Sequence, residues 1–198
     1  MTKTFEPKKF NLSELKGISN KTMEEHLGLY AGYVKSFNGI CELMGKLMTD
    51  EANGPALAEL QRRLSFEFGG MRLHEYYFAQ FEGGANALTA GSALEQKMIE
   101  QFGGVEAVKK FMKNVALMRG PGWAVLYYDK QSGNLMFGFS GEQHQGHFVG
   151  LPIVMCIDVW EHAFILDQGA TGKVKYVDAF FDNLNWQVCE NNFLEASK

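Results

Sequence analysis

Cysteine is scarce in this chain of 198 residues, which has only Cys41, Cys156 and Cys189. They form no CxxC pair, which argues against a structural zinc knot, and an odd number of scattered cysteines is typical of free thiols in a reducing compartment. No basic run is present, and the net charge of -4 argues against nucleic acid as a partner. No apolar stretch is long enough to span a membrane, and the polar start MTKTFEPKKF lacks a secretory signal. We therefore expect a cytoplasmic protein that binds neither nucleic acid nor membrane.

Hydrophobic residues make up 46% of the chain and charged residues 21%, as in an ordinary globular protein rather than a disordered one. Two stretches near the N-terminus, residues 19–38 and 56–81, carry apolar side chains at helical spacing. The turn-forming segment DEANGP separates them, and a glycine pair, Gly69 and Gly70, interrupts the second. Two helices with a short polar connection predict an antiparallel pair.

Residues 82–91 are rich in Gly, Ala and Asn and mark the best domain boundary. We predict an N-terminal helical hairpin domain over residues 1–82 and a C-terminal domain over residues 83–198. Within the second domain the pattern predicts helices over 92–102, 105–116 and 159–166, a last helix from about Tyr176, and strands over 123–128, 134–140 and 151–157. The expected fold class is α+β: an α-helical hairpin, then a three-stranded antiparallel sheet surrounded by helices.

The stretch IVMCIDVWEHAF places Asp158 at the end of an apolar run and His162 four positions later. A buried carboxylate needs a partner or a metal ion. His26 and His74 lie on the apolar sides of the two predicted helices. Each histidine alone is better explained as a core residue with a local hydrogen bond, but one ion would satisfy all four groups. Nitrogen and oxygen ligands suit iron, manganese or zinc, although periodicity does not show that the four residues converge.

Several segments resemble the iron/manganese superoxide dismutases. DVWEHAF, residues 158–164, resembles the signature of that family, and TMEEHLGLYAGYVKSFN, HEYYF, GPGWAVL and FFDNLNW occur in the family's order. The resemblance implies that one iron or manganese ion, with solvent as a fifth ligand, is bound between the two domains by His26, His74, Asp158 and His162. It also implies an antioxidant activity, in which superoxide becomes dioxygen and hydrogen peroxide as the ion is alternately reduced and oxidised.

The family places a glutamine, or in one branch a histidine, against the bound solvent. One of the two family positions for this residue is Gly70 here, so the loop EQHQGH must supply it. The alignment favours His144, as in the histidine branch, with Gln143 as the alternative because the register of the loop is uncertain by one residue. We expect the neighbouring His147 to be a solvated loop residue.

Other site residues follow from the same resemblance. Tyr33 corresponds to the family's gateway tyrosine, which helps to deliver protons, and Tyr30 competes for that role; both could instead be core aromatics. Trp123 and Trp160 are expected to line the core or the metal pocket. Glu161 resembles the residue that reaches across a two-fold interface to His162 of the partner subunit, which implies a homodimer and leaves a tetramer open.

Three hypotheses remain at this point. The leading one is a superoxide dismutase that acts on superoxide in oxidative stress, with the choice between iron and manganese open. The second is a catalytically weak or inactive metal-binding homologue. The third is a non-haem iron oxidase or oxygenase, which a fourth protein ligand disfavours because such enzymes bind iron through two histidines and one carboxylate.

Overall fold

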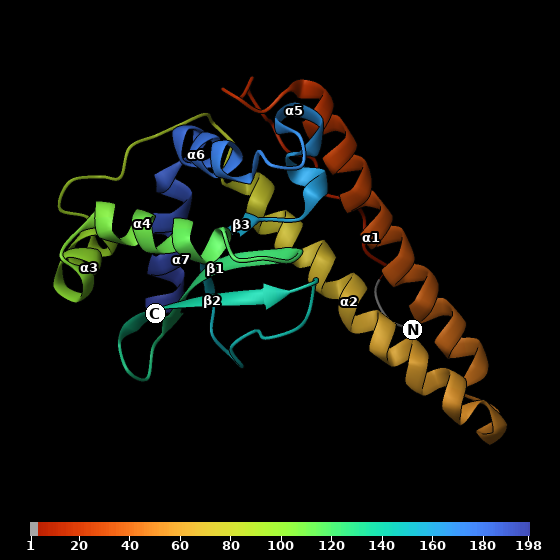
Figure 1. Cartoon of the computed structure of the whole chain (residues 1–198). Helices are drawn as coiled ribbons and strands as arrows, with labels where there is room; N and C mark the ends of the chain where they lie inside the picture. The colour runs from red at the N-terminus through yellow and green to blue at the C-terminus, as the bar shows by residue number, and fades with distance from the viewer. Residues whose placement is uncertain (1–3) are drawn as a thin grey trace.

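The structure, a computed structural model, describes residues 4–198. Its N-terminal part is a hairpin of two long helices, α1 (Asn20–Leu47) and α2 (Gly54–Ala79), joined by a 3-10 turn, η1 (Glu51–Asn53). α1 begins where the hydroxyl of Ser19 accepts a hydrogen bond from the backbone N–H of Thr22. The two helices lie side by side, and their connection points away from the rest of the molecule (Figure 1).

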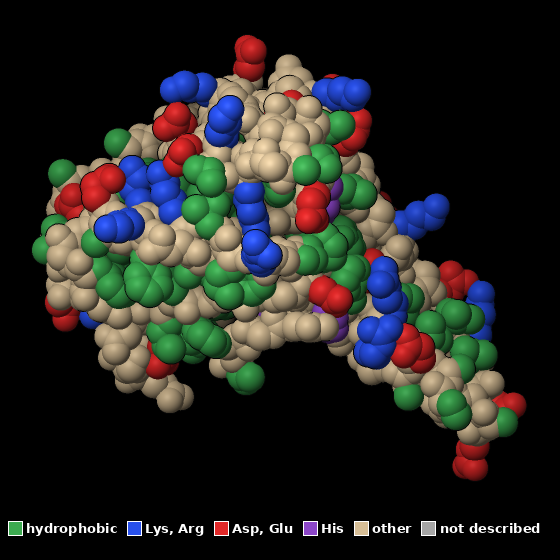
Figure 2. All heavy atoms as spheres, in the orientation of Figure 1, with side chains coloured by type: hydrophobic (Ala, Val, Ile, Leu, Met, Phe, Trp, Pro, Cys, Tyr) green, Lys and Arg blue, Asp and Glu red, His purple; other side chains and the backbone are tan. Residues whose placement is uncertain are grey.

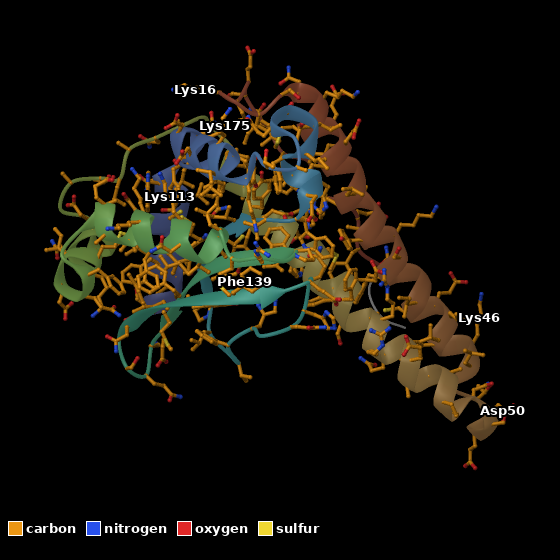
Figure 3. All side chains as sticks on the ribbon, in the orientation of Figure 1. Lys16, Lys46, Asp50, Lys113, Phe139 and Lys175 are labelled. Carbon is orange, nitrogen blue, oxygen red and sulfur yellow. The ribbon has the colours of Figure 1, made fainter. Side chains whose placement is uncertain are left out.

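Both helices of the hairpin differ from the prediction: α1 is longer, and α2 has no break. α1 runs past Asn38 to Leu47, although its last buried residue is Phe37. The apolar stripe ends there because the helix leaves the core, and the outer end of the hairpin, with Lys46 and Asp50 labelled in Figure 3, stands free of the body. α2 continues without a break through Gly69 and Gly70. The glycine pair therefore serves close packing rather than a turn.

The C-terminal part contains the predicted antiparallel sheet in the order β2-β1-β3. Its strands are β1 (Gly122–Asp129), β2 (Asn134–Gly141) and β3 (Ile153–Asp158). Two helices precede the sheet, α3 (Ala93–Phe102) and α4 (Val105–Ala116). Because β1 is central, Trp123 is paired with Ser140 on one side and with Asp158 on the other. This register brings the end of β3 and the loop after β2 to the same end of the sheet.

After the sheet the chain is helical to its end. The segments are η2 (Glu161–Ala163), α5 (Ile165–Gln168), α6 (Lys173–Asn183) and α7 (Trp186–Ser197). The prediction of one last helix from about Tyr176 is wrong in number and start. The extended backbone of Leu184, with ψ of 125°, ends α6, and the Asn185 side chain then caps α7 by accepting a hydrogen bond from the N–H of Gln187.

The fold class is the predicted α+β arrangement, and one cluster of buried apolar side chains links its parts. The cluster draws Tyr30 and Val34 from α1, Phe78 from α2, and Leu126 and Ile157 from the sheet. Since the hairpin and the sheet share this core, the division at residue 82 stays a prediction. In the described part of the chain, no helix combines the length and apolar character needed to cross a membrane.

Candidate metal centre

Four side chains from three parts of the chain meet at the base of the hairpin. His26 comes from α1, His74 from α2, Asp158 from the last position of β3 and His162 from η2. Each offers one ligand atom, and these atoms all lie within 4.8 Å of one another. Two ligands on opposite sides of one ion, with bonds of about 2 Å, lie about 4 Å apart, so the four atoms can surround a single ion.

The carboxylate of Asp158 is at the centre of this group. Its Oδ2 lies 3.1 Å from Nε2 of His26, 3.1 Å from Nε2 of His162 and 3.5 Å from Nε2 of His74. Its Oδ1 accepts a hydrogen bond of 2.9 Å from the backbone N–H of Trp160. One oxygen is thus fixed by the backbone, and the other faces all three imidazoles.

The protonation states suit a cation. Burial, followed by a smaller effect of His26, lowers the pKa of His74 to about 3, and burial likewise lowers the pKa of His26. Burial alone would raise the pKa of Asp158, but the charge of His162 and the hydrogen bonds from His162 and His26 hold that pKa well below its usual range. The centre therefore offers one ionised carboxylate and at least two neutral imidazoles.

His74 gives the most direct evidence that a metal ion binds here. Its Nδ1 donates to the backbone carbonyl of Gly70 at 2.6 Å, which leaves the lone pair on Nε2. That Nε2 is buried and has no hydrogen-bond partner in the described residues, which is uncommon in a folded protein. Since the four ligand atoms are nitrogen and oxygen with no thiolate, the donor set fits iron or manganese.

A chain of hydrogen bonds runs beside His74. The indole N–H of Trp123 donates to Oε1 of Gln143 at 2.9 Å, and Nε2 of Gln143 donates to the hydroxyl of Tyr33, also at 2.9 Å. The rings of Trp123 and Tyr33 lie 5.0 Å and 5.1 Å from the ring of His74, measured between centroids. Gln143 is fully buried. The amide of Gln143 is therefore held at both ends, next to the ligand cluster.

The glycine pair of α2 makes room for this chain. A Cβ atom at Gly69 would lie 1.9 Å from the backbone oxygen of Gln143, and one at Gly70 would lie 2.5 Å from the ring of Tyr33. Any larger residue would displace the loop or the tyrosine. The sequence shows the glycines but not what fills the space beside them, so this role was missed.

His144, the residue that the alignment favours, lies outside this chain of hydrogen bonds. Its ring meets the ring of Phe66 edge-on at 5.7 Å, and its Nδ1 has no hydrogen-bond partner among the described residues. The structure thus brings Gln143, the alternative of the two, into contact with Tyr33 and Trp123.

Tyr30 is buried but is tied to the N-terminal segment rather than to Gln143. Its hydroxyl accepts a hydrogen bond from the backbone N–H of Lys8 at 2.9 Å and donates to Oε1 of Glu75 at 3.3 Å. Its ring stacks on His74 at 6.4 Å. Glu75 also accepts a hydrogen bond from Arg72 at 2.7 Å. Tyr30 therefore packs against one of the four possible ligands and is held in place by Glu75, a residue that sequence reasoning missed.

Trp160 and Glu161 lie where η2 begins. The ring of Trp160 stacks on the ring of His162 at 5.9 Å, and its indole N–H donates to the backbone oxygen of Glu142 at 3.2 Å. Trp160 is thus one wall of the centre. The side chain of Glu161 is exposed in the single chain.

The sequence of this chain is similar to those of known proteins. Residues 90–192 match the C-terminal domain of iron/manganese superoxide dismutases. A protein of Aquifex pyrophilus named "Superoxide dismutase [Fe]" is 34% identical over 190 residues, which cover 93% of this chain and 88% of the relative. A protein of Mycolicibacterium smegmatis named "Superoxide dismutase [Mn]" is 30% identical over 175 residues, 87% of this chain and 82% of the relative. The chain belongs to the iron/manganese superoxide dismutase family.

Proposed function

We propose that this protein is a superoxide dismutase that uses one iron or manganese ion per subunit. When bound, the ion supplies the redox chemistry: one superoxide gives up an electron and leaves as dioxygen, and a second takes up an electron and two protons and leaves as hydrogen peroxide. The observation that carries the proposal is the convergence of His26, His74, Asp158 and His162 within 4.8 Å. The relatives named as iron and manganese superoxide dismutases support it.

The exposure of the ligands supports access for a small anion from one side. The side chains of His26, His74 and Asp158 are fully buried, whereas that of His162 is 22% exposed. On the face shown in Figure 2, histidine atoms reach the surface beside the base of the hairpin. Superoxide would enter on the side where His162 is exposed in the single chain, beside the contact with Glu161 of the partner subunit that is proposed below.

Tyr33 is the proton donor in this proposal. Burial, followed by the charge of Asp158, raises the pKa of Tyr33 to about 12, so its hydroxyl keeps its proton at neutral pH. Because Gln143 donates to the oxygen of that hydroxyl at 2.9 Å, the O–H of Tyr33 is free to donate elsewhere. Trp123 holds the Gln143 amide in the orientation that this requires.

The Tyr33→Phe variant should keep its metal and lose turnover by a constant factor of at least about 100 between about pH 6 and about pH 9. The factor should not change across this range because the hydroxyl stays protonated throughout. Steady-state superoxide consumption, followed at each pH for both proteins, measures the ratio. A ratio that returns to one within the range would show that Tyr33 is not the donor.

We propose Gln143, rather than His144, as the residue that faces the bound solvent. The Gln143→Ala variant should lose about 10- to 100-fold in turnover per bound metal ion, because it breaks both hydrogen bonds of the chain. His144→Ala is the matched control in the same loop and should stay within about twofold of the wild-type protein. The opposite ranking of the two variants would return the role to His144.

We propose a homodimer in which Glu161 of each subunit contacts His162 of the partner subunit; a tetramer would be two such dimers. The Glu161→Ala variant should weaken dimerisation at least about tenfold, because a charge paired inside an interface loses its partner. Glu195→Ala is the control, since Glu195 is exposed and pairs with Lys198 of its own chain. Sedimentation velocity over a range of protein concentrations measures both, and an unchanged dimer in Glu161→Ala would remove this residue from the interface.

We also propose a cytoplasmic location and a protective role in oxidative stress. The three cysteines, of which Cys156 and Cys189 are buried, are all free thiols, which suits a reducing compartment. Localisation of the tagged protein in its own cell would test this.

The function itself is tested on protein loaded separately with iron and with manganese. Stoichiometric metal with superoxide consumption well above that of the free ion is the expected result for at least one metal. Stoichiometric binding of both metals without activity would instead identify a metal-binding homologue that has lost turnover. An oxidase or oxygenase is less compatible with the site, because the fourth protein ligand leaves fewer open positions on the ion.

A further inference from the structure

The loop that follows β2 holds Gln143 in an unusual backbone. Glu142, directly before it, has a φ of 51° and is the one non-glycine residue with positive φ among residues 4–198. Side chains other than glycine rarely adopt this left-handed conformation, and it persists only where the surroundings hold it. Directly after it, Gln143 is fully buried, whereas Gln145 and Gly146 are exposed.

Backbone contacts fix the two ends of this loop. The N–H of Gly141 donates to the carbonyl of Gln145 at 2.9 Å, and the N–H of Gln145 donates back at 3.1 Å. The N–H of Glu142 donates to the carbonyl of Pro121 at 3.3 Å. None of these bonds involves the carbonyl of Gln143, which is pressed against Gly69 of α2. In the middle of the loop, the indole N–H of Trp160 donates to the carbonyl of Glu142 at 3.2 Å, which leaves the carbonyl of Gln143 as the backbone acceptor still to be accounted for.

His147 contacts that carbonyl. Its Nε2 lies 3.4 Å from the backbone oxygen of Gln143 and 3.0 Å from the hydroxyl of Ser140, and its Nδ1 lies 2.7 Å from the hydroxyl of Tyr127. Ser140 in β2 and Tyr127 in β1 are buried. The solvated loop histidine expected from the sequence is thus a half-buried residue with three polar partners.

The protons in this group have one consistent arrangement. Burial raises the pKa of Tyr127, so its hydroxyl keeps its proton, and burial lowers the pKa of His147, so its ring is neutral. Since the carbonyl of Gln143 can only accept, its contact with Nε2 places the ring proton on Nε2, and Nδ1 then accepts from the hydroxyl of Tyr127. The Nε2–H then points to Ser140 and to the carbonyl of Gln143.

We infer that His147 is a positioning residue: it ties the backbone of Gln143 to the sheet and so keeps the Gln143 amide between Trp123 and Tyr33. Tyr127 and Ser140 belong to the sheet, and His147 connects them to a loop whose backbone is strained at Glu142. The inference rests on the proposed function, because the placement of Gln143 matters to turnover only if the Trp123–Gln143–Tyr33 chain serves the reaction.

The test compares His147→Phe with the wild-type full chain, both loaded with the metal, iron or manganese, that gives the wild-type protein its higher turnover. Phenylalanine keeps a ring in place and removes both nitrogen contacts. Amide hydrogen exchange of a peptide covering residues 141–147 should become about tenfold faster, because the loop loses its central anchor. Turnover per bound metal ion should fall about tenfold while metal content stays at the wild-type value.

Two further variants separate positioning from general loss of structure. His147→Gln keeps a donor near the place of Nε2 and should recover part of both losses. Val149→Ala changes a side chain that is 98% exposed two residues along the loop, and it should match the wild-type protein in both measurements. If His147→Phe does not fold, Tyr127→Phe removes only the contact to Nδ1 and should show the same two changes at smaller size.

The two readouts keep the inference and the proposed function apart. Unchanged exchange of the loop in His147→Phe, or faster exchange with unchanged turnover, overturns the positioning role even when the wild-type protein is active. A wild-type protein that does not consume superoxide with either metal overturns the proposed function, and with it the catalytic half of the inference. Faster exchange together with lower turnover at full metal content supports both.

Discussion

Asp158→Ala should bind iron or manganese at least about 100-fold more weakly than the wild-type protein and lose superoxide consumption in the same proportion. Asp158 is the one anionic ligand of the four, and its Oδ2 is the atom around which the three imidazoles gather. Even residues that only support a ligand cost 10- to 100-fold in metal affinity when they are replaced, so the loss of a ligand should cost at least as much. Metal content by mass spectrometry and activity on the same sample measure the two losses.

The fold of Asp158→Ala should survive this change. Burial keeps His74 and His26 neutral, so the variant leaves no unpaired charge in the interior. The matched control is Asp182→Ala, which removes an exposed carboxylate that pairs with Lys16 and should change neither metal content nor activity. If Asp158→Ala kept its metal and its turnover, the ion would have to be bound elsewhere.

Gly69→Ala should destabilise the protein by about 2–3 kcal/mol and lower turnover at least about tenfold. The added Cβ would lie 1.9 Å from the backbone oxygen of Gln143, where two atoms cannot both fit, so the loop must move. A displaced Gln143 can no longer bridge Trp123 and Tyr33. Chemical denaturation and turnover per metal ion are the measurements.

The same substitution elsewhere in the hairpin has the opposite expected sign. At Gly39 in α1 a Cβ meets nothing within 4 Å, so Gly39→Ala should stabilise the protein by about 0.5–1 kcal/mol through helix propensity and leave turnover unchanged. The pair of variants separates crowding from the general effect of glycine in a helix. A Gly69→Ala protein that resembled Gly39→Ala would show that the loop has room to spare.

The fold could be predicted wherever one local pattern decided it. Helical spacing of apolar residues and the DEANGP break correctly predict the hairpin, and the patterns of residues 123–128, 134–140 and 151–157 correctly predict the three strands. The prediction is wrong where tertiary packing, rather than the local sequence pattern, determines the structure. The outer turns of α1 carry no buried stripe. Gly69 and Gly70 resemble a helix break in the sequence, but Gln143 of a distant loop fills the space beside Gly69, and the ring of Tyr33 in α1 fills the space beside Gly70.

Part of the site could likewise be predicted from local sequence patterns, and part could not. Asp158 and His162 stand in a specific motif, and His26 and His74 lie on helix faces that predict burial, so the four possible ligands could be named before their convergence was visible. The inward-facing residue of the loop after β2 could not be predicted in this way, because the polar residues of the loop have no periodicity. A shift of one residue in the alignment exchanges Gln143 for His144. The burial of Gln143 and its hydrogen bonds to Trp123 and Tyr33 show which side chain turns inward.

Anomalous X-ray diffraction from crystals of the metal-loaded protein, recorded at the iron and manganese absorption edges, tests the central claim most directly. The claim predicts one anomalous peak per chain, about 2 Å from Nε2 of His26, His74 and His162 and from Oδ2 of Asp158. A peak at any other place, or a fully loaded protein with no peak among these four atoms, would contradict it.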